Sequence, residues 1–268
     1  MAKDICVLIV EDDIYSRNMM AMMLTRDWRT RVIGEQYGRD DVIDILEQPI
    51  QQVDVILIGV ESSDDHEWPF QILDKVASID SPPVVLYAGT TVDHNLSYYS
   101  SHDLFGGYVL KSEILYSMAT AVALCSKGFR VITPGVRNWL GRGAEGRDIK
   151  VIDGGAKVAN FSRRESEIVH LGIIFNLSQR DIADELVIGT DWISEAMGNI
   201  YEKLGIHEIL SGQVSLDHYF EDELVLSHCE TILDRAGKNS RTGKLRKAPW
   251  MSTLAFHLLT TPLIEDYY

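Results

Sequence analysis

Ile5-Cys-Val-Leu-Ile-Val10 opens this 268-residue chain as a run of six apolar residues, and three carboxylates, Glu11, Asp12 and Asp13, follow at once. An apolar run of this length is typical of a strand buried on both faces, as in a parallel sheet. Residues 14–25 then show the pattern of a helix. A strand that leads directly into a helix is the building block of α/β folds.

The same alternation of short apolar runs and helical stretches continues to residue 127. The further predicted strands are 31–37, 53–58, 84–87 and 107–110, and the further predicted helices are 40–47, 70–77 and 112–126. Five strand–helix units predict a flavodoxin-like, doubly wound α/β domain over residues 1–127.

Residues 128–159 have a different composition. Seven of the chain's 20 glycines lie between residues 128 and 155. This predicts a linker over 128–159, with one short helix that begins at Pro134.

An all-α helix-turn-helix domain is predicted over residues 160–206. Ser162-Arg-Arg-Glu165 is a capping box that begins the first of three short helices, and Ser178 begins the second. In the third helix four apolar residues share one face, namely Ile193, Met197, Ile200 and Leu204. Three short helices joined by tight turns are typical of helix-turn-helix geometry.

Residues 207–268 form an atypical C-terminal extension. It is acidic and amphipathic over 207–233, and Arg235 to Lys247 then carries six basic residues and no acidic ones. Residues 250–259 predict a short apolar helix.

The overall composition is that of a globular protein, with 46% hydrophobic and 24% charged residues. No apolar run is long enough to span a membrane, and the N-terminus does not resemble a signal peptide. Cys6, Cys125 and Cys229 lie far apart, which favours free thiols in a reducing compartment. We therefore expect a cytoplasmic protein without membrane contact.

Residues 4–127 resemble the receiver domains of bacterial response regulators. The resemblance lies in Val7-Leu-Ile-Val-Glu-Asp-Asp13, in Asp54-Val-Ile-Leu-Ile58 and in Gly107-Tyr-Val-Leu-Lys111. It implies a pocket at the carboxyl edge of the sheet, where Mg²⁺ and a lysine neutralise a phosphoryl group as a carboxylate attacks it. The corresponding residues here are Glu11, Asp12, Gly59, Tyr87 and Lys111.

Two parts of that pocket are missing from this sequence. Gly59 replaces the aspartate that accepts the phosphoryl group, and Tyr87 replaces the usual Thr or Ser. We expect the bulk of Tyr87 to fill the pocket and phosphotransfer to be lost, unless Glu61 reaches in from the following loop. Asp12 and its neighbours then either cap the next helix or form a residual weak metal site; we expect no bound metal and no cofactor.

Residues 161–205 resemble the LuxR-type output domain of NarL/FixJ response regulators. The resemblance lies in Phe161-Ser-Arg-Arg-Glu165, in Leu177-Ser-Gln-Arg-Asp-Ile-Ala-Asp-Glu-Leu186 and in Ile200-Tyr-Glu-Lys-Leu-Gly-Ile206. It implies a dimer whose third helix enters the major groove of double-stranded DNA. The candidate DNA contacts are Arg163, Arg164, Arg180, Trp192, Ser194, Asn199 and Lys203.

The charge of this region opposes DNA binding. Residues 160–205 contain eight acidic and four basic residues, and Asp191 and Glu195 lie on the expected recognition helix. The basic run from Arg235 is either a solvated loop or a compensating phosphate contact. Trp192 either docks a partner protein or packs under the extension.

Two functions therefore remain open. The first is a phosphorylation-independent DNA-binding transcription regulator, for which the resemblance to the family implies a dimer. The second is a pseudo-response regulator that acts through protein–protein interaction. We expect no enzymatic activity, because no nucleophile–base pair, nucleotide loop or metal cluster is apparent.

Overall fold

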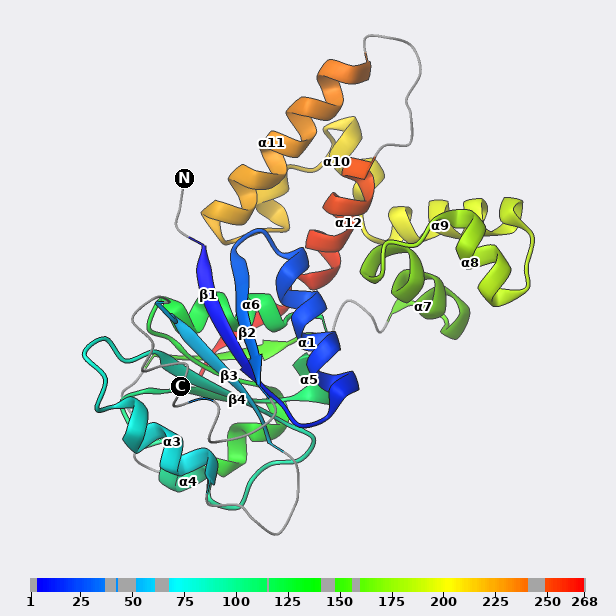
Figure 1. Ribbon diagram of the computed structural model, residues 1–268. Coiled ribbons are helices and arrows are strands. Elements are labelled where there is room, and N and C mark those ends of the chain that lie inside the picture. Colours follow the sequence, from blue (N-terminus) through cyan, green and yellow to red (C-terminus); the bar gives the residue numbers. More distant parts are fainter. Residues whose placement is uncertain are drawn as a thin grey trace. The chain divides into compact units, whose positions relative to one another are not determined.

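The computed structural model describes residues 4–36, 42, 52–60, 68–114, 116–140, 148–155, 160–240 and 249–267. The chain divides into two compact units (Figure 1). The first comprises Met1–Gly155 together with Pro262–Tyr268, and the second comprises Ala156–Thr261. Among the described residues, no helix is both long and apolar enough to cross a bilayer.

An eight-stranded sheet with the order β2-β1-β3-β4-β5-β6-β7-β8 forms the centre of the first unit. Its first five strands are parallel, and their order 2-1-3-4-5 is that of flavodoxin-like folds, which confirms the predicted doubly wound class. These strands are β1 (Ile5–Val10), β2 (Thr30–Gln36), β3 (Val55–Val60), β4 (Val84–Gly89) and β5 (Phe105–Leu110).

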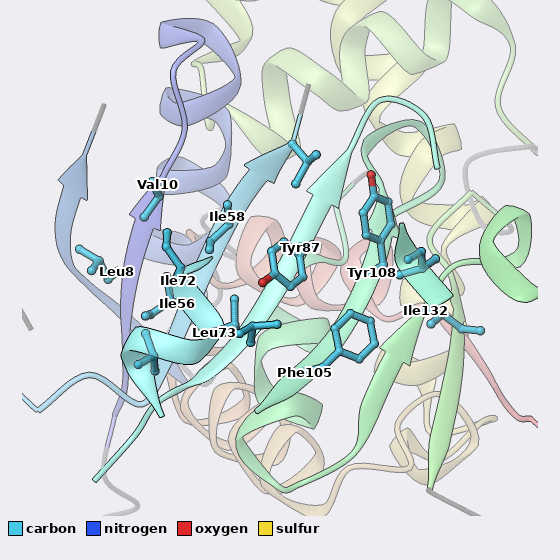
Figure 2. Packing of buried hydrophobic residues seen from close by; sticks show 14 of the residues in the cluster. Leu8, Val10, Ile56, Ile58, Ile72, Leu73, Tyr87, Phe105, Tyr108 and Ile132 are labelled. Carbon is cyan, nitrogen blue, oxygen red and sulfur yellow. The ribbon is translucent and has the colours of Figure 1, made fainter. Parts of the chain in front are cut away.

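Helices cover both faces of the sheet. Against one face, α3 (Trp68–Val76) contributes Ile72 and Leu73 to an apolar layer that also holds Tyr87 and Tyr108 (Figure 2). Because side chains alternate along a strand, buried residues such as Leu57 belong to the opposite face. The other helices with described bounds in this unit are α1 (Ile14–Arg26), α4 (Leu96–Tyr99), α5 (Lys111–Ile114) and α6 (Met118–Ser126).

The prediction of a linker over 128–159 is wrong for most of its described residues. β6 (Arg130–Ile132) pairs in parallel with β5, and β7 (Ile149–Asp153) pairs in parallel with β6; η1 (Pro134–Trp139) lies between them. β6 can approach because Gly107 has φ +142°, and a Cβ there would overlap the carbonyl oxygen of Val131. The first domain therefore extends to residue 155 rather than 127.

The chain returns to this sheet at its C-terminal end. β8 (Leu263–Asp266) pairs antiparallel with β7, with Leu263 opposite Asp153. Ion pairs join Arg137 to Glu265 and Lys150 to Asp266. The predicted extension thus ends in the first unit, and the helix-turn-helix unit is inserted between two neighbouring strands.

The second unit contains the three predicted helices. They are α7 (Arg163–Val169), which continues into the π-helical turn η4 (His170–Ile174), then α8 (Gln179–Leu186) and α9 (Thr190–Lys203). Both parts of the Ser162–Glu165 capping box are formed, and Ser178 caps α8. The predicted apolar face of α9 is buried, from Ile193 to Leu204.

The described part of this unit also contains α10 (Ile206–Ser211), η5 (Leu216–His218), α11 (Glu223–Ser240) and α12 (Pro249–Thr260). The last is the apolar helix predicted over 250–259, and it packs against η4 and α11. Residues 241–248, which hold most of the predicted basic run, lie outside the described residues.

Candidate functional site

Three of the predicted pocket residues meet at the carboxyl ends of β1, β3 and β5. Glu11 follows β1, Gly59 lies near the end of β3, and Lys111 follows β5. The ammonium of Lys111 lies 2.7 Å from Oε2 of Glu11. A Cβ atom on residue 59 would lie 2.5 Å from Cδ of Glu11 and would overlap Oε2. The Glu11 carboxylate therefore occupies the space into which a side chain at position 59 would project.

Hydrogen bonds hold the Glu11 carboxylate in this place. Ser16 Oγ donates to Oε2 at 3.1 Å, and the amide of Asp13 donates to Oε1 at 3.1 Å. The guanidinium of Arg17 donates to the backbone carbonyl of Glu11 at 2.6 Å. Glu11 is only 2% exposed, so this is a buried and fully bonded carboxylate.

Tyr87 does not belong to the pocket, which corrects the expectation that its bulk fills it. In the β3–β4 pairing, Ile58 faces Tyr87 and Gly59 faces Ala88. Side chains of paired residues share a face, so Tyr87 lies with Ile58 in the apolar layer, where its ring stacks on Phe105 at 6.0 Å (Figure 2). Ala88 is the residue beside Gly59, and it has no hydroxyl.

Tyr108 lies in the same apolar layer and is completely buried. Its hydroxyl donates to the carbonyl of Thr91 at 2.7 Å, and a Cβ on Gly89 would overlap that hydroxyl. Burial, reinforced by the nearby Asp93 carboxylate, raises the pKa of Tyr108. The neutral phenol is thus fixed inside the domain, as a buried strand residue.

The acidic residues after Glu11 have different surroundings. Asp13 caps α1, since its carboxylate accepts the amide of Ser16 at 2.7 Å. Asp12 is exposed, and partial desolvation together with the charge of Glu11 raises its pKa. Across the described part of the chain, no three His, Cys, Asp or Glu side chains are placed to hold a metal ion. Glu61 lies outside the described residues.

Residues that directly follow β6 and β7 hold the chain on both sides of Lys111. Thr133 Oγ1 accepts the amide of Leu110 at 3.0 Å, and Gly135 donates to the Glu113 carboxylate at 2.9 Å. The amide of Gly154 donates to the carbonyl of Glu113 at 3.0 Å. Lys111 is therefore positioned by the continuation of the sheet beyond β5.

The solvent-facing surface of α9 is acidic. Its exposed residues include Asp191, Glu195 and Glu202, with Trp192 and Asn199 between them. Ser194 is partly exposed, and Lys203 at the last turn is the helix's only basic residue. A recognition surface of this kind repels phosphates.

Most of the predicted DNA-contacting cations form ion pairs inside the unit. Arg163 and Arg164 lie 3.5 and 2.7 Å from the Glu167 carboxylate. Lys203 lies 2.8 Å from Glu165, and this hydrogen bond, together with that from the Ser162 amide, lowers the pKa of Glu165 to about 2. Arg180 is exposed and makes no ion pair with another described residue.

The turn between α8 and α9 carries a feature that the sequence did not reveal. Val187 adopts φ 54° and ψ 51°, a left-handed conformation that is rare for a β-branched residue, and it is 91% exposed. Trp192, in the first turn of α9, is 43% exposed. Both alternatives for Trp192 therefore stay predictions, because more than half of its surface is covered and residues 241–248 of the extension lie outside the described residues.

Comparison with known proteins relates the chain to response regulators. No family model matches it. It is 22% identical to the Fimbriae Z protein of Escherichia coli K12 over 215 residues. This alignment covers 78% of this chain and 94% of that protein. It is 30% identical to the sensory transduction protein LytT of Bacillus cereus over 83 residues. This alignment covers 31% of this chain and 32% of LytT, so the chain spans about a third of that relative's length.

Among solved structures, the chain is similar to the RcsB response regulator of Salmonella typhimurium, with 19% identity, coverage of 76% of this chain and 93% of that one, and a TM-score of 0.42. A second structure shows the two-component response regulator RcsB in complex with DNA, with 20% identity, the same coverage of 76% and 93%, and a TM-score of 0.42. The chain is thus similar to response regulators, as its sequence predicts.

Proposed function

We propose that this chain is a response-regulator-like transcription regulator that works without phosphorylation. The observation that carries this proposal is the position of the Glu11 carboxylate, which fills the space at Gly59 and binds Lys111. An acyl phosphate needs a carboxylate that can attack the donor and a cation that is free to neutralise the transferred group. Gly59 offers no carboxylate, and Lys111 is already neutralised.

Glu11 is itself a poor substitute for the missing acceptor. Its carboxylate is buried and is bonded to Ser16, Asp13 and Lys111. Attack on a phosphodonor would require these bonds to break and the side chain to reach solvent. Intact mass measurement after incubation with acetyl phosphate and Mg²⁺ tests the proposal. We expect no added phosphoryl group; an adduct on Glu11 or on residues 55–65 would contradict it.

Double-stranded DNA is the proposed target, bound by a homodimer, as RcsB dimers bind DNA. The helix-turn-helix arrangement of α7, α8 and α9 supports this. Because the exposed face of α9 is acidic, we assign the phosphate contacts to Arg163, Arg164, Arg180 and Lys203, of which three would have to exchange an internal carboxylate for a phosphate.

The same electrostatics favour a second candidate, a regulator that acts through a partner protein. Asp191 and Glu195 lie with Trp192 in the first two turns of α9, and Glu202 lies in its last turn; all three carboxylates are exposed. Like charges raise the free energy of docking on DNA, whereas an exposed tryptophan is a common anchor in protein interfaces.

Fluorescence anisotropy with a pool of random DNA duplexes at several salt concentrations separates the two candidates. If DNA is the target, Asp191→Lys with Glu195→Lys should raise affinity, and each phosphate contact should add about 0.9 to the slope of log affinity against log salt. Glu221→Lys with Glu223→Lys, also exposed in the second unit, is the matched control for net charge. Absence of wild-type binding at low salt would exclude the DNA candidate.

A further inference from the structure

The turn between α8 and α9 combines three features that are unfavourable for an isolated domain. Val187 is a β-branched residue in the left-handed region, a conformation that Gly or Asn adopts more readily. Its side chain is 91% exposed, and Trp192, five residues later, is 43% exposed. Val187 is almost fully exposed and Trp192 nearly half exposed, so neither belongs to the buried core.

Acidic residues flank Val187 and Trp192 along the chain. Asp184 and Glu185 lie in the last turns of α8, where the negative end of the helix dipole disfavours carboxylates. Asp191 and Glu195 lie in the first two turns of α9, and all four are exposed. The stretch from residue 181 to 195 contains five acidic residues and neither Lys nor Arg. We call Val187, Trp192 and these four carboxylates the turn surface.

We propose that the turn surface docks a basic segment of a partner protein. The partner places an apolar side chain against Val187 and Trp192, and Lys or Arg residues around that side chain pair with the four carboxylates. Charge complementarity identifies this occupant, because a polyanion such as DNA is repelled by the same four carboxylates. The inference rests on the second candidate function and names its surface and its partner chemistry.

The test uses the full-length chain and synthetic 18-residue peptides followed by fluorescence anisotropy. The probe is an amphipathic lysine–leucine peptide; the controls are its lysine–serine and glutamate–leucine counterparts and a random DNA duplex. We expect the lysine–leucine peptide to bind in a salt-dependent manner, and the lysine–serine peptide to bind much more weakly because it lacks the apolar anchor.

Two variants examine the anchor. Trp192→Ala should weaken peptide binding by roughly tenfold or more, as expected for a tryptophan at the centre of an interface. Val187→Asn should weaken binding while leaving the melting temperature unchanged or higher, because asparagine tolerates the left-handed conformation. If Val187 had only a structural role, Val187→Asn would not weaken peptide binding while keeping or raising the melting temperature. Leu224→Asn, on α11 and likewise 43% exposed, is the matched control and should bind as the wild type does.

Four results would overturn the inference. The first three are no binding of the lysine–leucine peptide, equal binding of the lysine–serine peptide, and peptide binding that neither variant changes. A fourth is binding of the DNA duplex that is lost in Trp192→Ala, which would make the turn surface a DNA contact. None of these outcomes depends on phosphodonor chemistry. The proposal that the chain works without phosphorylation is therefore tested separately, by the acetyl phosphate experiment.

Discussion

Glu11 stands in for the side chain that Gly59 lacks: a Cβ on residue 59 would lie 2.5 Å from Cδ of Glu11. The space beside residue 59 on β3 is thus filled by a carboxylate that follows β1. This carboxylate accepts a hydrogen bond from Lys111 and so forms an internal ion pair with it. Glycine at position 59 is therefore required by this arrangement.

The first prediction concerns Lys111. Lys111→Met leaves the buried Glu11 carboxylate without its cation, which should lower the stability of the first unit by about 3 kcal/mol. Lys111→Met combined with Glu11→Gln removes the charge as well and should cost less than Lys111→Met alone. Native-state hydrogen exchange of the β1 and β5 amides measures both. If the single and the double variant lose the same stability, the charges of Glu11 and Lys111 do not stabilise each other.

A second prediction concerns the pH dependence of the helix-turn-helix unit. The pKa of Glu165 is lowered to about 2, chiefly by its hydrogen bond with Lys203. A lowered pKa stabilises the fold above the ordinary value of 4.5, and this contribution is lost as the pH falls toward 2. The wild type should therefore melt at a higher temperature than Glu165→Gln near neutral pH, and the difference should shrink between pH 4.5 and 2.

Far-UV circular dichroism follows this melting through the helical signal. Glu202→Gln, which removes an exposed charge from α9, is the control and should show little difference from the wild type. If the difference in melting temperature between the wild type and Glu165→Gln stays constant across this pH range, the interaction with Lys203 is not its cause.

The third prediction concerns β8. Deleting residues 263–268 exposes the edge of β7 and removes the ion pairs that Glu265 and Asp266 make. The first unit should lose about 1–2 kcal/mol of stability, the range of a few hydrogen bonds, and β7 amides should exchange faster. Glu265→Gln with Asp266→Asn removes only the charges and should cost about 0–1 kcal/mol, since exposed ion pairs contribute little. Unchanged protection of β7 after the deletion would show that β8 is dispensable.

The long elements of the fold could be predicted from the sequence because each carries a local signal. The apolar run of β1 and the capping box at Ser162 are two such signals, and each is formed by residues that are neighbours in the chain. β6 has only three residues and β8 only four, so neither shows a period, and their pairing depends on partners elsewhere in the sheet.

The candidate pocket was predicted only in part, for two physical reasons. An error of one residue in a strand moves a side chain to the other face, which is why Tyr87 appeared to be in the pocket and Ala88 did not. The direction of the Glu11 side chain is set by Lys111, which lies 100 residues away in the chain. The left-handed conformation of Val187 gave no signal, because valine is not a residue expected there.

The central claim is that the Glu11 carboxylate fills the space beside residue 59. A double-mutant cycle between Gly59→Ala and Glu11→Ala tests it most directly. The free energy of unfolding of each variant is measured by hydrogen exchange of the β3 amides. In the wild type, Gly59→Ala should cost about 1–2 kcal/mol, because the new methyl group displaces a carboxylate held by Lys111 and Ser16. In the Glu11→Ala background the same change should cost almost nothing, which gives a coupling of about 1 kcal/mol or more. Additive effects, within about 0.5 kcal/mol, would contradict the placement of Glu11 in the space at position 59.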